Sequence, residues 1–175
     1  MINLRIVRQT FDFDCGAKAL QAVMEYYGVD IREDELLEEL KADEYGTNYA
    51  DIIALAQKKG FSVFAENGVS LEKLQLFIDN GNPVIVLVQA WADKYMTLEE
   101  WKSDYEDGHY VVVIGYDNNI IIFEDPASPR RTWMTKEEFL ARWHDKEPGT
   151  GKKLQNFAMV LLGKNPVTKM VEHMD

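Results

Sequence analysis

Helical and strand patterns are segregated along this chain of 175 residues, and that segregation is the strongest constraint on its fold. Apolar residues recur at helical spacing in the first half, whereas continuous or alternating apolar runs dominate the second. An order of helices first and strands second favours the α+β class, with a cleft where the two halves meet. We therefore expect a helical lobe over about residues 9–80 and a sheet lobe over about residues 83–163, within one domain of residues 1–175.

The first predicted helix is apolar on more than one side. A surface helix carries a single apolar stripe, so this helix should be buried. Glycines at positions 28 and 60 mark two of the expected helix ends. The predicted helices of this half are Cys15–Tyr27, Arg32–Lys41, Tyr49–Lys59 and a helix capped by Ser70 that runs to Ile78, with short strands at Leu4–Val7 and Phe61–Ala65.

Strands and one acidic insertion make up the second half. The segment Pro83–Gln89 is a continuous apolar run, which is typical of a central strand. Residues 91–107 are acidic and irregular, with a helical turn expected at Leu98–Trp101. The remaining predicted elements are a hairpin of His109–Tyr116 and Ile120–Asp125 around residues 117–119, a helix capped by Thr135 that runs to Trp143, and a last strand at Leu154–Leu162.

Composition excludes several classes of function. A formal net charge of -11 and a pI near 4.7 disfavour binding to nucleic acid or to anionic membranes. The apolar runs are far shorter than the roughly 18 residues of a membrane span, and the N-terminus lacks the apolar core of a signal peptide. Because the single cysteine cannot form an internal disulfide, we expect a cytoplasmic protein.

The single cysteine, Cys15, is the first candidate for chemistry. A lone cysteine is usually a small buried hydrophobe, but its neighbours here favour a reactive thiol. Asp14 is a good N-cap, so Cys15 should lie in the first turn of its helix, where the helix dipole lowers the pKa of a thiol. Gly16 permits close approach of another group to the backbone. The side-chain amide of Gln9, six residues upstream, could donate to an oxyanion together with first-turn N–H groups.

His109 and Asp125 are the candidates for a base and its orienting carboxylate. Taken alone, they have ordinary interpretations as an edge histidine and an Asp-Pro turn. A three-residue hairpin loop pairs Tyr116 with Ile120 and sets Asp125 opposite Val111. His109 and Asp125 then lie on one sheet face as diagonal neighbours about 7–8 Å apart at the backbone, close enough for their side chains to meet. A two-residue loop would place them on opposite faces.

The other histidines, His144 and His173, are interpreted as incidental, since one lies near a helix end and the other in a polar tail. One cysteine and scattered histidines do not make a zinc-ligand pattern. We therefore predict neither a metal nor a cofactor.

The joint pattern resembles the C39 peptidases, which are papain-like domains that cut bacteriocin leader peptides after a Gly-Gly pair. The resemblance rests on Gln-x5-Cys-Gly at Gln9–Gly16, Gly-His-Tyr-Val-Val-Val-Ile-Gly at Gly108–Gly115, and the pair Asp125-Pro126, and it covers most of the chain. It implies a papain-like fold in which the helical half packs against an antiparallel sheet. The roles that it implies are nucleophile for Cys15, base for His109, orienting group for Asp125 and oxyanion donor for Gln9.

The best-known C39 domains are fused to a membrane-spanning, ATP-driven exporter, whereas this chain has neither spans nor a nucleotide-binding domain. The resemblance therefore implies a free-standing C39-like domain, with a peptide or protein as substrate and an exporter as one candidate partner. The leading interpretation is hydrolysis of a peptide bond. Two alternatives stay open at this point: an amidase or transpeptidase with the same triad, and a non-catalytic peptide-binding module, against which the intact Cys15 argues.

Overall fold

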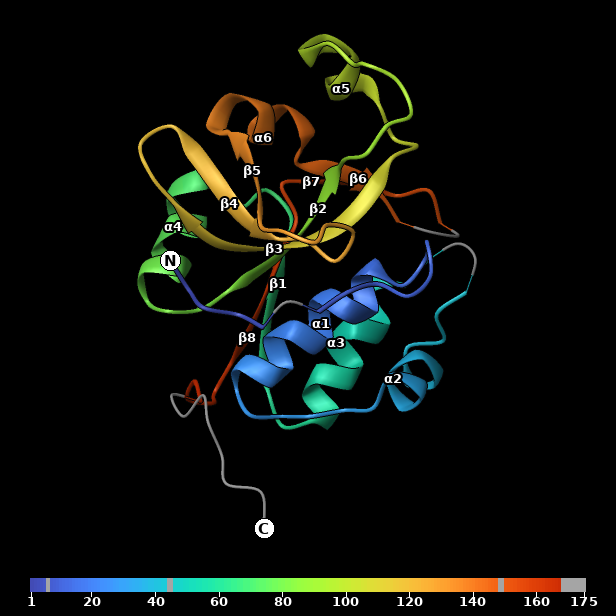
Figure 1. Cartoon of the computed structure of the whole chain (residues 1–175), viewed down its shortest axis with the longest axis vertical. Helices are drawn as coiled ribbons and strands as arrows, with labels where there is room; N and C mark the ends of the chain where they lie inside the picture. Colours follow the sequence, from blue (N-terminus) through green and yellow to red (C-terminus); the bar gives the residue numbers. More distant parts are fainter. Residues whose placement is uncertain (6, 44–45, 148–149, 168–175) are drawn as a thin grey trace.

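The centre of the protein is an antiparallel sheet, shown in the computed structural model of Figure 1, which describes residues 1–5, 7–43, 46–147 and 150–167. The strands are β1 (Ser62–Glu66), β2 (Val84–Gln89), β3 (Gly108–Tyr116), β4 (Ile120–Glu124), β5 (Thr132–Thr135), β6 (His144–Lys146), β7 (Lys153–Gln155) and β8 (Ala158–Leu162). Six of them form the main sheet in the order β1-β8-β2-β3-β4-β5, and β6 pairs with β7 in a second sheet.

The helices gather on the two sides of this sheet. They are α1 (Cys15–Tyr26), α2 (Glu33–Glu39), α3 (Tyr49–Lys58), α4 (Leu71–Asp79), α5 (Leu98–Ser103) and α6 (Lys136–Arg142). In Figure 1, α1, α2 and α3 lie on one side, and α6 with α5 lies on the other. Ser70 and Thr135 cap α4 and α6 through their side chains, as predicted. Helices in the first half and antiparallel strands in the second confirm the α+β class.

The helix α1 belongs to the core, as its two apolar sides predicted. All of its residues from Gly16 to Met24 are buried, and it packs on α2, α3 and β3. Its two polar buried side chains are satisfied: Lys18 Nζ lies 2.9 Å from Glu33 Oε1, and Gln21 Nε2 donates to Ile31 O at 3.0 Å. Packing on three elements fixes the position of the residue at which α1 begins.

The hairpin of β3 and β4 is one residue out of its predicted register at the turn. Tyr116 pairs with Ile121, whereas the predicted partner was Ile120. A β-bulge between Val113 and Gly115 absorbs the extra residue. Beyond the bulge the pairing returns to the predicted alignment. His109 and Asp125 therefore lie on the same face of the sheet, as predicted.

The predicted last strand is two strands. Asn156, with φ of 49°, breaks Leu154–Leu162 into β7 in the small sheet and β8 between β1 and β2. Asparagine tolerates this left-handed region better than most residues, although nothing in the apolar pattern marks the break. The predicted strand at Leu4–Val7 falls partly on residue 6, outside the described residues, and its described members form no strand.

Candidate active site

The helix α1 begins at Cys15, so the thiol lies at the N-terminal end of a buried helix. The residue is partly exposed. Asp14 occupies the N-cap position as predicted, but its side chain does not cap α1. Instead, Asp14 Oδ2 accepts a hydrogen bond from the Thr10 N–H at 3.0 Å. This bond ties the loop that carries Gln9 to the start of the helix.

Gly16 lets the sheet approach the start of α1, as the sequence predicted. A Cβ at this position would lie 2.9 Å from Cδ2 of the Tyr110 ring and 3.2 Å from Cβ of Thr47. The Tyr110 ring is itself held by a 3.1 Å hydrogen bond from its hydroxyl to the Thr47 carbonyl. Since Tyr110 follows His109 in β3, this contact fixes the strand of the histidine against the helix of the cysteine.

Replacing Gly16 with alanine is expected to lower the free energy of unfolding by about 1–3 kcal/mol, because the buried Tyr110 ring cannot yield to the added methyl group. Urea denaturation monitored by circular dichroism will measure the change. Gly115→Ala is the matched control, since the nearest atoms to its methyl group belong to the exposed Met1, with Cγ at 3.2 Å. Equal stabilities of the two variants would contradict the close approach at Gly16.

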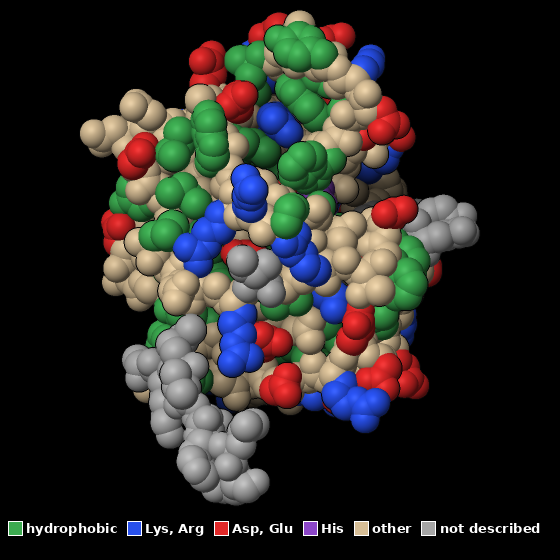
Figure 2. Space-filling view, in the orientation of Figure 1, with side chains coloured by type: hydrophobic (Ala, Val, Ile, Leu, Met, Phe, Trp, Pro, Cys, Tyr) green, Lys and Arg blue, Asp and Glu red, His purple; other side chains and the backbone are tan. Residues whose placement is uncertain are grey.

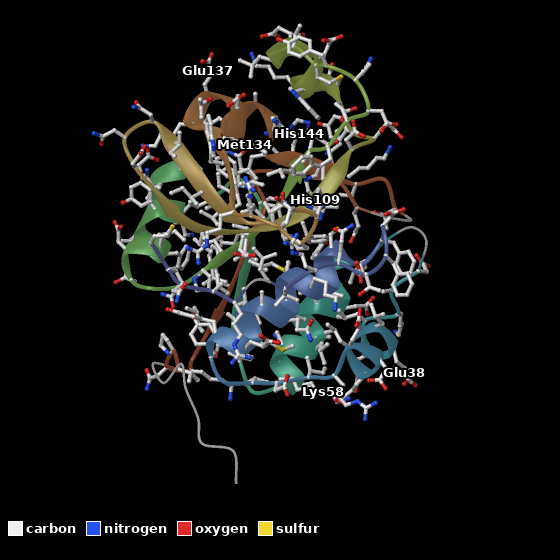
Figure 3. All side chains as sticks on the ribbon, viewed as in Figure 1. Glu38, Lys58, His109, Met134, Glu137 and His144 are labelled. Atoms are coloured by element: carbon white, nitrogen blue, oxygen red, sulfur yellow. The ribbon has the colours of Figure 1, made fainter. Side chains whose placement is uncertain are left out.

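His109 and Asp125 lie on the same face of the sheet, because side chains alternate between the two faces along each strand. Nε2 of His109 lies 2.8 Å from Oδ1 of Asp125, and the two residues are 7% and 2% exposed. In Figure 3 His109 lies where the sheet meets α1, and in Figure 2 only a small area of histidine surface is visible on the face in view. The predicted contact between these two side chains is therefore confirmed, and it fixes the orientation of the imidazole ring.

Three further donors hold the Asp125 carboxylate. Oδ1 accepts from the Ala127 N–H at 2.9 Å, and Oδ2 accepts from Trp91 Nε1 at 3.2 Å and from Thr132 Oγ1 at 3.3 Å. Burial alone would raise the pKa of Asp125, but the hydrogen bond and charge of His109, with the Ala127 and Thr132 donors, lower it below its usual value. Asp125 is therefore an anion at neutral pH.

Cys15 lies close enough to His109 to affect the pKa of its ring. Because Asp125 occupies Nε2, Nδ1 is the ring nitrogen that is left for the thiol. Burial lowers the pKa of His109, but Asp125 and Cys15 together outweigh this and raise it to about 9. At neutral pH the imidazole is therefore protonated and able to donate a proton. A cysteine beside a proton donor of this kind can perform acyl transfer.

Gln9 lies beside the same group through its backbone. Its N–H donates to the carbonyl of Pro126, the residue after Asp125, at 3.0 Å. The side-chain Oε1 is buried and has no hydrogen-bond partner among the described residues. The Gln9 loop is thus fixed to the Asp125 segment, while a contact between the amide and Cys15 stays a prediction.

The remaining histidines lie apart from this cluster. His144 is buried, and its Nε2 bonds to the Asp104 carbonyl at 2.8 Å, while His173 lies outside the described residues. The described ranges contain no group of three or more His, Cys, Asp or Glu that could hold a metal ion. Among the helices of those same ranges, none has the length and apolar character needed to cross a bilayer.

Sequence reasoning missed two of the side chains on Asp125, those of Trp91 and Thr132. Trp91 begins the acidic insertion and Thr132 begins β5, and neither belongs to a motif. Their contacts join positions 34 and 7 residues from Asp125 in the chain. Such contacts depend on how the insertion and β5 fold back, which a local sequence pattern does not encode.

A family model described as the Peptidase_C39 like family matches residues 1–148. The chain belongs to that family. The peptidase domain of Streptococcus ComA, a bifunctional ABC transporter, is 29% identical and superposes with a TM-score of 0.66 over 92% of this chain and 98% of that domain. A double glycine motif protease from an AMS/PCAT transporter, solved with its leader peptide, is 18% identical with a TM-score of 0.64 and covers 91% of each chain. The predicted C39 family and papain-like peptidase fold are confirmed.

Two proteins are similar to this chain in sequence. An uncharacterized protein of Methanothermobacter marburgensis is 33% identical over 126 residues, which are 71% of this chain and 73% of that protein. The sublancin-168-processing and transport ATP-binding protein SunT of Bacillus subtilis is 24% identical over 142 residues, which are 78% of this chain and 17% of SunT. The C39 domain is therefore related to the peptidase domains of peptide-processing transporters.

Proposed function

We propose that this C39 domain is a cysteine peptidase in which Cys15, His109, Asp125 and Gln9 carry the reaction. The observation that supports it most is the continuous series from the Cys15 thiol through the His109 ring to the Asp125 carboxylate. Nucleophile, base and orienting group occur there in the order that acyl transfer requires.

The proposed reaction begins with attack of the Cys15 thiolate on a peptide carbonyl carbon, which forms a C–S bond and an oxyanion. Backbone N–H groups of the first turn of α1 and the Gln9 amide would stabilise that oxyanion. The His109 imidazolium gives its Nδ1 proton to the leaving amine as the C–N bond breaks. His109 then takes a proton from water, whose oxygen attacks the thioester. The C–S bond breaks, which returns the thiolate of Cys15 and releases the carboxylic acid. Asp125 holds the ring in one orientation throughout.

The proposed substrate is a peptide with a double-glycine leader, cut in the cytoplasm. Support comes from the relatives, because one solved neighbour is a double glycine motif protease with its leader peptide and SunT processes sublancin-168. A reducing compartment would keep the single thiol available for chemistry. A transporter that carries the processed peptide is the proposed partner.

Incubation with synthetic leader peptides, followed by mass spectrometry, tests this function. We expect cleavage directly after a Gly-Gly pair and no cleavage when that pair is replaced by Val-Val. Cys15→Ala serves as the inactive control. Cleavage that is absent with every peptide of a diverse library, from a preparation whose thiol is intact, would contradict the peptidase assignment.

Gln9→Ala should leave the fold unchanged and lower kcat by about 10²–10³-fold, since an oxyanion donor is worth that much in related chemistry. Single-turnover cleavage will measure the chemical step directly. Gln57→Ala, a change in the third helix away from the site, is the control for loss of a glutamine amide. An unchanged kcat in Gln9→Ala would remove this side chain from the mechanism.

A further inference from the structure

Trp91 combines two features that rarely occur together. Its backbone has φ of 64°, a left-handed conformation that bulky residues adopt only where the surrounding structure enforces it. Its side chain is 58% exposed, so burial of the ring gives little reason for the strain. Strained conformations of this kind cluster at functional sites, and they motivate a search for what the side chain does.

The indole reaches the candidate site. Its Nε1–H donates to Oδ2 of Asp125 at 3.2 Å, while Oδ1 of the same carboxylate binds His109 at 2.8 Å. Each carboxylate oxygen is therefore held from a different side, and the carboxylate cannot rotate without breaking one of these bonds.

The backbone around Trp91 is anchored to the strand that carries the histidine. The preceding residue, Ala90, donates its N–H to the Asp107 carbonyl at 2.8 Å, and the Asp107 N–H donates to Oε1 of Gln89 at 3.0 Å. Two residues after Asp107 comes His109, which pairs with Val88 of β2. The insertion 91–107 thus starts at the residue that binds Asp125 and ends two residues before the histidine that Asp125 binds.

We infer that Trp91 is a positioning residue of the proposed active site, whose strained backbone aims the indole N–H at Asp125 and so fixes the His109 ring toward Cys15. The inference rests on the proposed function for its effect on turnover. The effect of the indole N–H on the His109–Asp125 pair can be measured without any substrate, through the pKa of His109.

Two variants separate the donor from the backbone strain. Trp91→Phe keeps a ring and removes the N–H, whereas Trp91→Gly removes the ring and relieves the positive φ. The charged groups that act on His109 are Cys15 from α1 and Asp125 after β4. Loss of the indole frees the carboxylate to move, which weakens its hydrogen bond to His109 and shifts the pKa of His109 from about 9 toward the value of 6.5 for a free imidazole.

The measurements are a nuclear magnetic resonance titration of the His109 ring, the kcat and KM for peptide cleavage, and the melting temperature. In Trp91→Phe we expect the His109 pKa to fall by about half a unit or more, and kcat to fall about tenfold at unchanged KM, equivalent to about 1.4 kcal/mol. In Trp91→Gly we expect the same losses with no matching loss in melting temperature, because relief of the strain offsets the lost ring contacts. A residue with a purely structural role would lose stability and activity together.

The controls are Trp133→Phe, which changes a tryptophan of similar exposure, 61%, and Lys41→Gly, which relieves a positive φ of 50° just after α2. Both should leave the His109 pKa and kcat at the parent values. Parent-like values of both quantities in Trp91→Phe would overturn the inference. If the parent protein itself cleaves nothing, the proposed function fails, whereas the His109 titration still decides whether Trp91 controls the pair.

Discussion

Replacing Cys15 with alanine is expected to lower the rate of peptide cleavage by about 10⁵-fold or more, because no other group in the site can form the acyl-enzyme. Cleavage of a Gly-Gly leader peptide, followed by mass spectrometry, will measure this loss. The fold should persist, because Cys15 is partly exposed at the first position of α1 and the methyl group fills part of the space of the thiol.

The thiol can also be tested without a substrate. Since Cys15 is the only cysteine, one equivalent of iodoacetamide should label the folded protein at a single site and abolish activity, and Cys15→Ala should take no label. Labelling should proceed in the folded protein at neutral pH, because Cys15 is partly exposed at the first position of α1. A thiol that reacts only after denaturation would identify Cys15 as a packing residue.

Asp125→Asn should lower kcat by about 10²–10⁴-fold with little change in the fold, because an amide can hold the imidazole in the wrong tautomer. The variant keeps the size of the side chain but loses the charge that acts on His109. Single-turnover kinetics will give the size of the loss. Asp117→Asn, a change of the same chemistry in the exposed turn of the hairpin, is the matched control.

The same variant makes a prediction about pH. The parent should lose kcat/KM as pH rises through about 9, where His109 gives up the proton that the leaving amine needs. Burial lowers the pKa of His109 and Asp125 raises it. Removal of the Asp125 charge should therefore lower the pKa of His109. The basic limb of the pH profile should therefore move to lower pH in Asp125→Asn. A limb that stays near pH 9 in this variant would contradict the assigned origin of the shift.

The stability of the fold also depends on protonation of His109. The folded-state pKa of His109, about 9, lies above the 6.5 of the unfolded chain, so protonation stabilises the fold fully below pH 6.5. This contribution is lost as pH rises through about 9. Melting temperatures across this interval should fall in the parent and fall less in Asp125→Asn.

The sequence predicted those parts of the site that depend on local periodicity. Side chains alternate along a strand with period two, so a three-residue loop was enough to place His109 and Asp125 on one face. The register at the turn was wrong by one residue, because the bulge before Gly115 depends on the fit of two strands. Glycine inside a strand is a known signal for such a bulge, although it does not say where the extra residue goes.

Contacts between segments that are distant in the chain could not be predicted from the sequence. The left-handed backbone at Asn156 divides one apolar run between two sheets. The pattern of apolar residues does not predict that division. The hydrogen bond from Trp91 to Asp125 arises only when the insertion returns to β3. Both features depend on tertiary structure, which overrides the local preferences that sequence patterns report.

The placement of Cys15 on the first helix and of His109 on a middle strand has a consequence for the newly made chain. At about 5–20 residues per second, ribosomal synthesis takes roughly 5–20 s to add the 94 residues after Cys15 up to and including His109. During that interval Cys15 has no histidine beside it, because the strand that packs on Gly16 does not yet exist. Under the proposed function, the domain is therefore inactive as a peptidase until the sheet packs on α1, after most of the polypeptide has been made.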